Sequence, residues 1–261
     1  SDVCSSDLTQ DLVWLTASAT AGITSAAIAG LSTTQIASLT PAQIGAISAS
    51  AVPGLTPDQI TALTPSQSRQ LTSLQLRNFS NEQLSAIEAN DFAAIGAVQL
   101  SALTTSQITV LSTDQIVALT RSQTMNLKTT QLRAFSGEQI QALETNDLPV
   151  LSTLQLAAFS NDQLATLRTD QIAALTGVQV GSLTASQIGA FSADQVRAIE
   201  TRDLTAISNA QISVLSGDVV SQLTTGQIAA LTVTQFSSLR TSQIAVLRSE
   251  EHTSELQSRE T

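Results

Sequence analysis

Residues that most enzymes use for chemistry are scarce in this sequence. Its 261 residues include one cysteine (Cys4), one histidine (His252), one lysine (Lys128) and no tyrosine. A lone cysteine excludes a disulfide framework within the chain and a cysteine-based zinc site. Between residues 9 and 247 there is no histidine, so no Ser–His pair can activate any of the abundant hydroxyl groups. We therefore expect no catalytic residue and no enzyme activity.

Charged and aromatic side chains are also rare, at 12% and 3% of the residues. The chain is still 42% apolar, which is too much for a charged disordered chain. Its formal net charge is −10, and residues 9–247 alone carry nine basic and fifteen acidic residues, a net charge of −6. The basic residues do not recur as a regular stripe, which a nucleic-acid surface would need. We expect no nucleic-acid partner.

The dominant feature is a tandem repeat of eight residues. From Leu31 the chain reads LSTTQIAS LTPAQIGA ISASAVPG LTPDQITA, and this phase continues without insertion or deletion through Leu239. In those 27 octads position 1 is always Leu, Ile or Phe, position 2 is Ser or Thr in 20, position 5 is Gln in 22 and position 6 is apolar in 25. Ser68 and Thr124 are the two polar residues at position 6. Such self-similarity is typical of repeat architectures.

Each octad carries the signals of a helix start. Ser or Thr at position 2 followed by Gln at position 5 is the capping-box pattern, in which the two side chains bond to each other's backbone amides. Positions 1 and 6 then become the two apolar partners of a hydrophobic staple. Position 3 becomes the first helical residue, where proline is favoured, and Pro41, Pro57 and Pro65 stand there.

The pattern predicts an all-α solenoid with one short helix per octad. One continuous helix is excluded because eight residues at about 100° each would rotate the apolar face by roughly 80° per repeat. A β-solenoid remains the alternative, since Thr and Ile favour strands whereas Gln and Ala do not. Pro53 and Pro149, at position 7, imply helices of little more than one turn. Such helices are unstable alone, so stacked neighbours must bury a shared core, with positions 1 and 6 inside and most charges outside.

A longer period of seven octads lies above the single octad. Related segments begin at Phe79, Phe135 and Phe191, and in each of them one octad has Glu at position 2 and Asp at position 5. These acidic pairs are Glu88/Asp91, Glu144/Asp147 and Glu200/Asp203. Two carboxylates are too few for the six to eight oxygens of a calcium shell, whereas acids suit a helix N-terminus. We predict no metal site and no cofactor, although binding of a cation by these pairs stays open.

The two ends of the chain differ from the array. Ser1–Leu8 and Arg248–Ser258 can be back-translated to opposite strands of one oligonucleotide, which resembles a short-read sequencing-library adapter. We therefore interpret residues 1–8 and 248–261 as adapter-derived and leave them out of the fold prediction. Residues 9–30 are interpreted as degenerate repeats and residues 31–247 as the octapeptide solenoid. The interior array is then expected to be part of a longer chain with flanking domains.

The Ala- and Thr-rich segment Leu12–Gly30 needs a membrane check. It has no flanking basic residues and is diluted by Ser and Thr, and the octad phase extends back into it through Ile23 and Leu15. No membrane span is expected.

Two known kinds of repeat resemble this sequence. LTPAQIGAIS from Leu39 and LTPDQITAL from Leu55 are similar to the first helix of TAL-effector DNA-binding repeats, but the base-reading loop and the longer repeat of that family are missing. The resemblance implies that L-T-P-x-Q-I begins a helix. It also gives the alternative function, a helical-repeat module that binds nucleic acid or protein.

The array from Leu31 to Leu247 as a whole resembles the LTTxQIxAL octapeptide arrays of large, adhesin-like bacterial surface proteins. That resemblance implies a non-enzymatic spacer, stalk or extended interaction surface outside the cell or on its surface, with protein or cell-surface partners.

Overall fold

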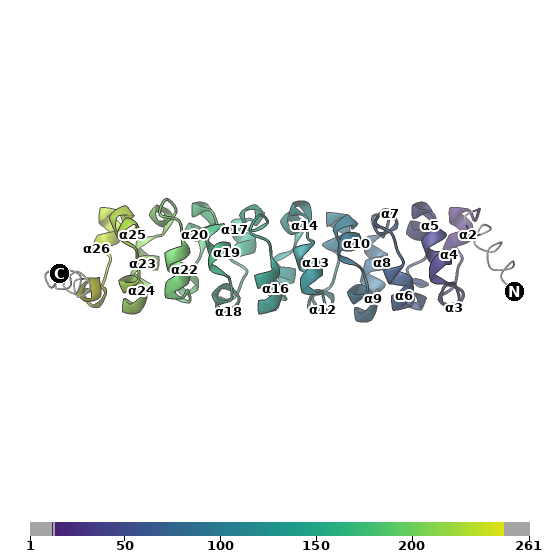
Figure 1. Ribbon diagram of the computed structural model, residues 1–261, viewed down its shortest axis with the longest axis horizontal. Helices are drawn as coiled ribbons and strands as arrows, with labels where there is room; N and C mark the ends of the chain where they lie inside the picture. The colour runs from purple at the N-terminus through teal and green to yellow at the C-terminus, as the bar shows by residue number, and fades with distance from the viewer. Residues whose placement is uncertain (1–11, 13, 248–261) are drawn as a thin grey trace, which may run out of the picture. The chain divides into compact units, whose positions relative to one another are not determined.

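The computed structural model describes residue 12 and residues 14–247 of the chain. All regular structure in this described part is helical, without a single strand, so the all-α prediction is confirmed and the β-solenoid alternative is wrong. The chain divides into two compact units, residues 1–135 and residues 136–261, and each is described by itself. Both are drawn in Figure 1, the first from purple to teal and the second from teal to yellow.

The first unit is a succession of one-turn helices. Its elements are α2 (Ala17–Ala21), α3 (Ser25–Ala29), α4 (Thr33–Ser38), α5 (Pro41–Ala46), η1 (Val52–Gly54), α6 (Pro57–Thr61), α7 (Pro65–Ser68), α8 (Ser73–Asn78), α9 (Asn81–Ser85), α10 (Ala89–Ala94), α11 (Ala97–Leu100), α12 (Thr105–Ile108), α13 (Thr113–Val117), α14 (Arg121–Asn126) and α15 (Thr129–Arg133).

The second unit continues the same pattern. Its elements are α16 (Gly137–Ala142), η2 (Leu148–Val150), α17 (Thr153–Leu156), α18 (Asn161–Ala165), α19 (Thr169–Ala173), α20 (Gly177–Ser182), α21 (Ala185–Gly189), α22 (Ala193–Ala198), η3 (Leu204–Ala206), α23 (Asn209–Val214), α24 (Gly217–Ser221), α25 (Thr225–Ala230) and α26 (Val233–Ser237). From Leu31 to Ser238 each octad therefore holds one short helix, as predicted.

The capping box starts these helices, and α5 shows how. The Gln43 amide donates to the Thr40 hydroxyl at 3.3 Å, and the Thr40 amide donates to Gln43 Oε1 at 2.7 Å. Pro41 occupies the first helical position, where its missing amide hydrogen costs nothing. A residue at position 1 commonly ends the helix by turning extended, as Leu39 does after α4 with φ −62° and ψ 139°. The predicted helix starts are thus confirmed.

Three octads contain a 3-10 helix of three residues instead of an α-helix: η1, η2 and η3. None of them has Gln at position 5, where Ala51, Asp147 and Asp203 stand instead. Two of them also carry proline at position 7, Pro53 and Pro149, so the expectation of a shortened helix there is confirmed. We call the two capping-box hydrogen bonds between positions 2 and 5 the clasp. The three octads with a 3-10 helix all lack the glutamine of the clasp, although α10 and α24 are α-helical without that glutamine.

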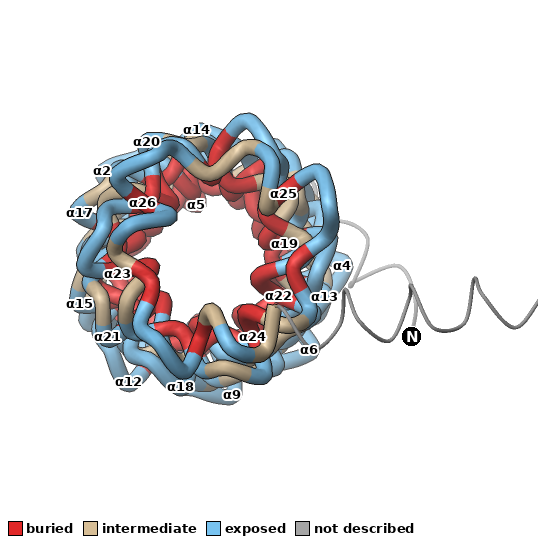
Figure 2. Tube along the Cα trace, turned by 90° about the vertical axis from the view of Figure 1, so that its left-hand side faces the viewer, coloured by how far each residue is buried: buried red, intermediate tan, exposed pale blue. Residues whose placement is uncertain are grey.

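Helices stack on the helix three octads away. In the first unit α2 contacts α5 and α7 contacts α10, and in the second unit α18 contacts α21 and α20 contacts η3. Each unit is therefore a coil, and its buried positions lie on the inner side with its exposed positions outside (Figure 2). The predicted core is confirmed at positions 1 and 6, for example at Leu63 and Ile60. Position 5, which the sequence analysis had not placed, is buried as well in most octads.

The segment before Leu31 follows the same phase. Helices α2 and α3 begin after Thr16 and Thr24, whose hydroxyls accept from the amides of Ala19 and Ala27 at 3.2 Å. Both octads have Ala at position 5 and therefore only half of the clasp. No helix in the described part of the chain combines the length and apolarity needed to cross a bilayer.

Candidate functional site: the glutamine ladder and the acidic octads

The side chain at position 5 joins one turn of the coil to the turn before it. Gln59 is 2% exposed, and its Oε1 accepts from the Thr56 amide at 2.8 Å. Its Nε2 donates to the carbonyl oxygens of Ile28 at 2.8 Å and Leu31 at 2.7 Å. Ile28 is in the last turn of α3, and its carbonyl also accepts from the Leu31 amide at 3.2 Å. Leu31 follows the helix, where carbonyl groups lack intrahelical partners. One glutamine therefore caps the start of its own helix and the end of another.

This bonding recurs through both units and forms what we call the glutamine ladder. In each case the glutamine Nε2 donates to the backbone carbonyl oxygens of the residues 31 and 28 positions earlier in the chain. This holds for Gln43, Gln59, Gln67, Gln75, Gln83, Gln107, Gln115, Gln123, Gln131, Gln171, Gln179, Gln195, Gln211, Gln227, Gln235 and Gln243. The ladder reaches the helix four octads back, whereas packing is with the helix three octads back. A turn therefore holds between three and four octads.

The sequence contained a signal for the ladder that the capping box alone does not explain. A capping box accepts Glu as readily as Gln at its last position. Position 5 is nevertheless Gln in 22 of 27 octads and never Glu. Only the amide offers a donor as well as an acceptor, so this preference indicates a second partner that must receive a hydrogen bond.

The ladder also operates where the hydroxyl is missing. Lys128, Arg168 and Arg240 occupy position 2 and cannot accept from the helix, yet their amides still donate to Gln Oε1 at 2.9, 2.9 and 2.6 Å. The between-turn bonds of those glutamines are kept. With a basic residue at position 2, the bond from its backbone amide to the glutamine Oε1 and the between-turn bonds from the glutamine Nε2 are thus both kept.

The acidic octads interrupt the ladder. In each pair the Glu is exposed and the Asp is buried, with Asp91, Asp147 and Asp203 at 3, 5 and 9% exposure. An ionised Asp has no donor and is one methylene shorter than Gln, so it cannot replace the between-turn bonds. Burial, with a smaller contribution from the nearby Glu88 charge, raises the pKa of Asp91 from 3.8 to about 6.

The acidic pairs are thus split between two environments, with the Glu exposed and the Asp buried. Within residues 12 and 14–247 no group of three His, Cys, Asp or Glu side chains is placed to hold a metal ion. Arg202 forms ion pairs with both members of the third pair, Glu200 and Asp203. The buried Asp203 Oδ2 accepts no hydrogen bond and lies 3.8 Å from Arg202 Nε.

Two shallow surface depressions of about 500 Å³ open beside the exposed glutamates, one at Glu88 and one at Glu200. They are equivalent, since corresponding lining residues such as Gln115 and Gln227 are separated by fourteen octads, which is twice the long period. Each lies inside one unit, between an acidic octad and the octad three further along.

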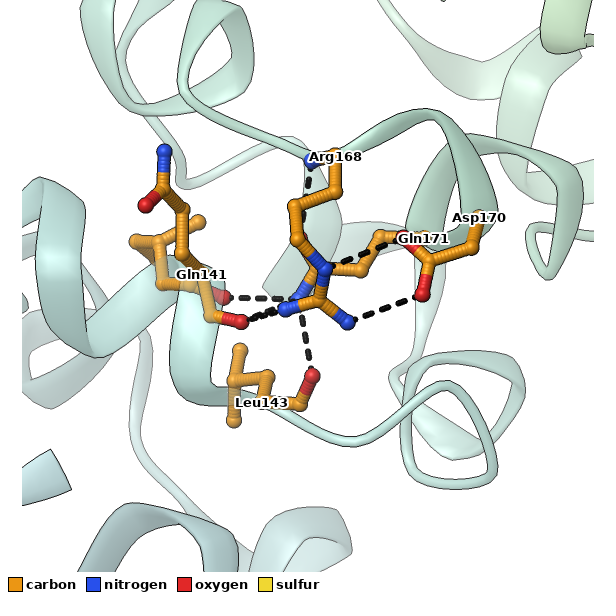
Figure 3. A network of polar contacts seen from close by, with 6 residues as sticks. Gln141, Leu143, Arg168, Asp170 and Gln171 are labelled. Atoms are coloured by element: carbon orange, nitrogen blue, oxygen red, sulfur yellow. Dashed lines mark hydrogen bonds and ion pairs between the residues drawn. The ribbon is translucent and has the colours of Figure 1, made fainter. Parts of the chain in front are cut away.

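The equivalent place in the middle copy is occupied by an arginine, shown in Figure 3. Arg168 donates through Nε and Nη2 to the two carboxylate oxygens of Asp170, both at 3.0 Å, and through Nη1 to the carbonyl oxygen of Gln141. The hydrogen bond from Arg168 is the main cause of a lowered pKa at Asp170 and outweighs the opposing effect of desolvation. Below the guanidinium, Gln171 donates to the carbonyls of Gln141 at 3.2 Å and Leu143 at 2.7 Å as part of the ladder.

Comparison with known families agrees with this periodicity. A family model described as the ALTTAQ repeat matches residues 84–121, 140–177 and 196–233. Successive matches start one long period apart, and each contains one acidic pair. The chain is thus a tandem array with similarity to ALTTAQ repeats. A search of curated proteins found no match.

Cys4, His252 and both adapter-like terminal peptides lie outside the described residues.

Proposed function

We propose that this chain is a non-enzymatic structural repeat region that acts as a spacer, stalk or extended interaction surface within a larger bacterial surface or secreted protein. The observation that carries the proposal is the glutamine ladder. Most octads with Gln at position 5 are attached to the preceding turn by the same buried bonds, so further octads of this kind can add turns without altering the local structure. A scaffold with nearest-neighbour bonding of this kind suits a role in which length is the adjustable property.

The surface of each unit supports the same proposal. Position 4 and the Ser or Thr at position 2 face outward in octad after octad, which presents a regular polar surface. The two depressions beside the exposed glutamates are open and shallow.

The proposed spacer role predicts that length follows octad number. Variants with residues 140–195 deleted, duplicated or triplicated keep the octad phase and the ladder, and each would be fused between the same two folded domains. Small-angle scattering should then give a maximum dimension that grows by a constant increment with each added copy of that segment. A dimension that does not grow with added repeats would overturn the proposal.

The location outside the cell rests on the resemblance to surface-protein arrays and is tested separately. An antibody raised against residues 140–195 should label intact cells of a bacterium that produces the full protein, and external protease should remove the label. Labelling only after the cells are opened would contradict the extracellular assignment and leave the spacer role unaffected.

A further inference from the structure

We propose that octads 87–94 and 95–102 form a joint, a place where adjacent turns of the first unit separate more readily than at the equivalent octads of the second unit, 199–206 and 207–214. Gln99 is the ladder side chain whose disengagement weakens the joint. The opening itself does not depend on the spacer role, although in a spacer the joint would be the place that lengthens first under load.

Two consecutive rungs of the glutamine ladder are missing at the joint. Asp91 stands at position 5 of the first octad and supplies no donor when it is ionised. Gln99 stands at position 5 of the second octad, but it is only partly buried, and its side chain makes no hydrogen bond to any residue in the described part of the chain. By the spacing of the ladder its acceptors would be the carbonyls of Ser68 and Leu71. No hydrogen bond from the described residues reaches the Leu71 carbonyl.

A missing rung at Ala51, in the same unit, is isolated. The octads on either side of it contain Gln43 and Gln59, and both keep their between-turn bonds. The turns on either side of Ala51 are therefore still attached to each other by the neighbouring rungs, whereas at the joint two neighbouring rungs are missing together.

Gly96, at position 2 of the second octad, accounts for the disengaged glutamine. A hydroxyl at this position is not essential, because the ladder is kept where Lys128 and Arg168 stand there. Gly96 also lacks a β-carbon, and a β-carbon at this residue would collide with Gln99 Oε1. The Gln99 side chain thus folds back into space that any other residue at position 2 would fill.

The third long period shows the same rung in its closed form. Ser208 and Gln211 stand where Gly96 and Gln99 stand in the first period. The Ser208 amide donates to Gln211 Oε1 at 2.6 Å, and Gln211 Nε2 donates to the Leu183 carbonyl at 2.6 Å. Both places follow an acidic octad, so the acidic octad is not what distinguishes the open rung from the closed one.

The core beside the joint differs in the same direction. Ser68 lies in α7, the helix that packs on α10 of the joint, and it occupies position 6, which is apolar in 25 of the 27 octads. Its hydroxyl is fully buried and has no hydrogen-bond partner, whereas Val180 stands at the equivalent place of the third period. A buried hydroxyl without a partner is hydrated when the turns separate, so it lowers the cost of opening.

The expected difference between the two places is large enough to measure. The joint lacks the two ladder bonds that Gln211 makes in the third period, and two hydrogen bonds of ordinary strength correspond to about tenfold or more in an opening equilibrium. Helix α11 still packs on α8 and α14, so the opening is local and the coil is kept around it.

Native-state hydrogen exchange of the full chain compares the two places directly. The Leu100 amide donates to the Gly96 carbonyl at 2.9 Å and the Ile212 amide donates to the Ser208 carbonyl at 3.0 Å, so the two amides report on matched helices. After division by the intrinsic rates, Leu100 should exchange about tenfold or more faster than Ile212. Equal protection of the two amides, or slower exchange at Leu100, would overturn the proposal.

Gly96→Ser tests whether Gln99 is the missing rung. The new β-carbon displaces the Gln99 side chain and the hydroxyl completes the clasp, so exchange at Leu100 should slow by about tenfold and the Gln99 side-chain amide protons should become protected. In a Gln99→Ala background the same serine should slow exchange by no more than about twofold, because serine is only a slightly better N-cap than glycine. No slowing in Gly96→Ser, or the same slowing without Gln99, would contradict the role of Gln99.

A matched pair of deletions tests the disengaged state from the other side. Gln99→Ala should leave exchange at Leu100 within about twofold of the original chain, since no side-chain bond is lost. Gln211→Ala should speed exchange at Ile212 by about tenfold or more, since its ladder bonds are lost. Unchanged helical circular dichroism in both variants shows that the fold is kept. Equal acceleration in the two variants would refute the open rung.

Discussion

Octads with glutamine at position 5 and octads with aspartate there bury the same position with opposite consequences. Gln171 is fully buried and has a partner for both ends of its amide, accepting from Arg168 and donating to Ile140 and Leu143. Asp91 is nearly as buried but supplies only acceptors when it is ionised. The glutamine at position 5 thus has two roles: it caps the start of its own helix and attaches that helix to the preceding turn.

The aspartate octads recur with the long period of seven octads. Packing links octads three apart and the ladder reaches four octads back, so one turn holds between three and four octads. Within the second unit, Asp147 and Asp203 occupy corresponding octads and interrupt the ladder there.

The largest expected effect comes from placing an acid at a core position instead of position 5. Leu175, at position 1, is 2% exposed, so an acid in its place would be buried. Leu175→Asp should therefore lower the free energy of unfolding by about 4 kcal/mol or more. Urea denaturation followed by the helical circular dichroism signal measures the loss, and limited proteolysis should show cleavage near α20.

Val178→Asp is the matched control. Val178 belongs to the same octad but is 74% exposed, so the free energy of unfolding should change by no more than about 0.5 kcal/mol. An equal loss in the free energy of unfolding in Leu175→Asp and Val178→Asp would mean that position 1 does not face the core and position 4 does not face the solvent as described.

Removing a ladder side chain should have the next largest effect. Gln171→Ala deletes the cap on the Arg168 amide and removes the side-chain donor from the Ile140 and Leu143 carbonyls. The Ile140 carbonyl still accepts from the Leu143 amide at 3.2 Å, so the Leu143 carbonyl is the more affected acceptor. Since an unsatisfied buried polar group costs about 1–3 kcal/mol, we expect a loss of about 3 kcal/mol in urea denaturation. A lost cap alone would cost about 1 kcal/mol.

An exposed glutamine provides the comparison for that variant. Gln222 lies at position 8 on the surface, and Gln222→Ala should be almost neutral. A loss in Gln171→Ala no greater than that of a cap would show that the between-turn bonds contribute little to stability.

The sequence was sufficient to predict whatever depended on neighbours within one octad. The start of α5 could be predicted from Thr40, Pro41 and Gln43, because the N-cap residue, the first helical residue and the capping-box glutamine all lie within a single octad. The donor side of Gln43 was not predicted, since its partners lie 31 and 28 residues earlier, and that distance depends on octads per turn. The same holds for the depressions. The contact of Arg168 with Gln141 forms only once the coil has brought octads four apart together.

The first aspartate octad should give the protein an unusual response to acid. The pKa of Asp91 is raised to about 6 in the fold and is 3.8 without burial, so the folded protein binds the proton more tightly than the unfolded chain. Protonation of Asp91 therefore stabilises the fold, and this contribution is lost as the pH rises through about 6. We expect a gain on the order of 2 kcal/mol between neutral pH and pH 4, since a pKa unit corresponds to about 1.4 kcal/mol and partial hydration reduces the total.

Asp91→Asn separates this response from other titrations, because an amide does not change charge over that range. Urea denaturation as a function of pH should show a flatter profile for Asp91→Asn than for the original chain. Parallel profiles would show that Asp91 titrates at its ordinary pKa and that its burial is not costly.

The smallest effect isolates the local half of the clasp. Thr176 is exposed at position 2, and its hydroxyl accepts from the Gln179 amide at 3.3 Å, while Gln179 keeps its bonds to Leu148 and Leu151. Thr176→Ala should therefore cost about 1 kcal/mol, as for other lost N-caps, and Thr176→Ser should restore most of it. An unchanged urea midpoint in Thr176→Ala would mean that the ladder alone sets the helix start. A loss as large as that of Gln171→Ala would mean that Gln179 needs the Thr176 hydroxyl in order to bond to the Leu148 and Leu151 carbonyls. Helix capping and attachment to the preceding turn would then not be separable.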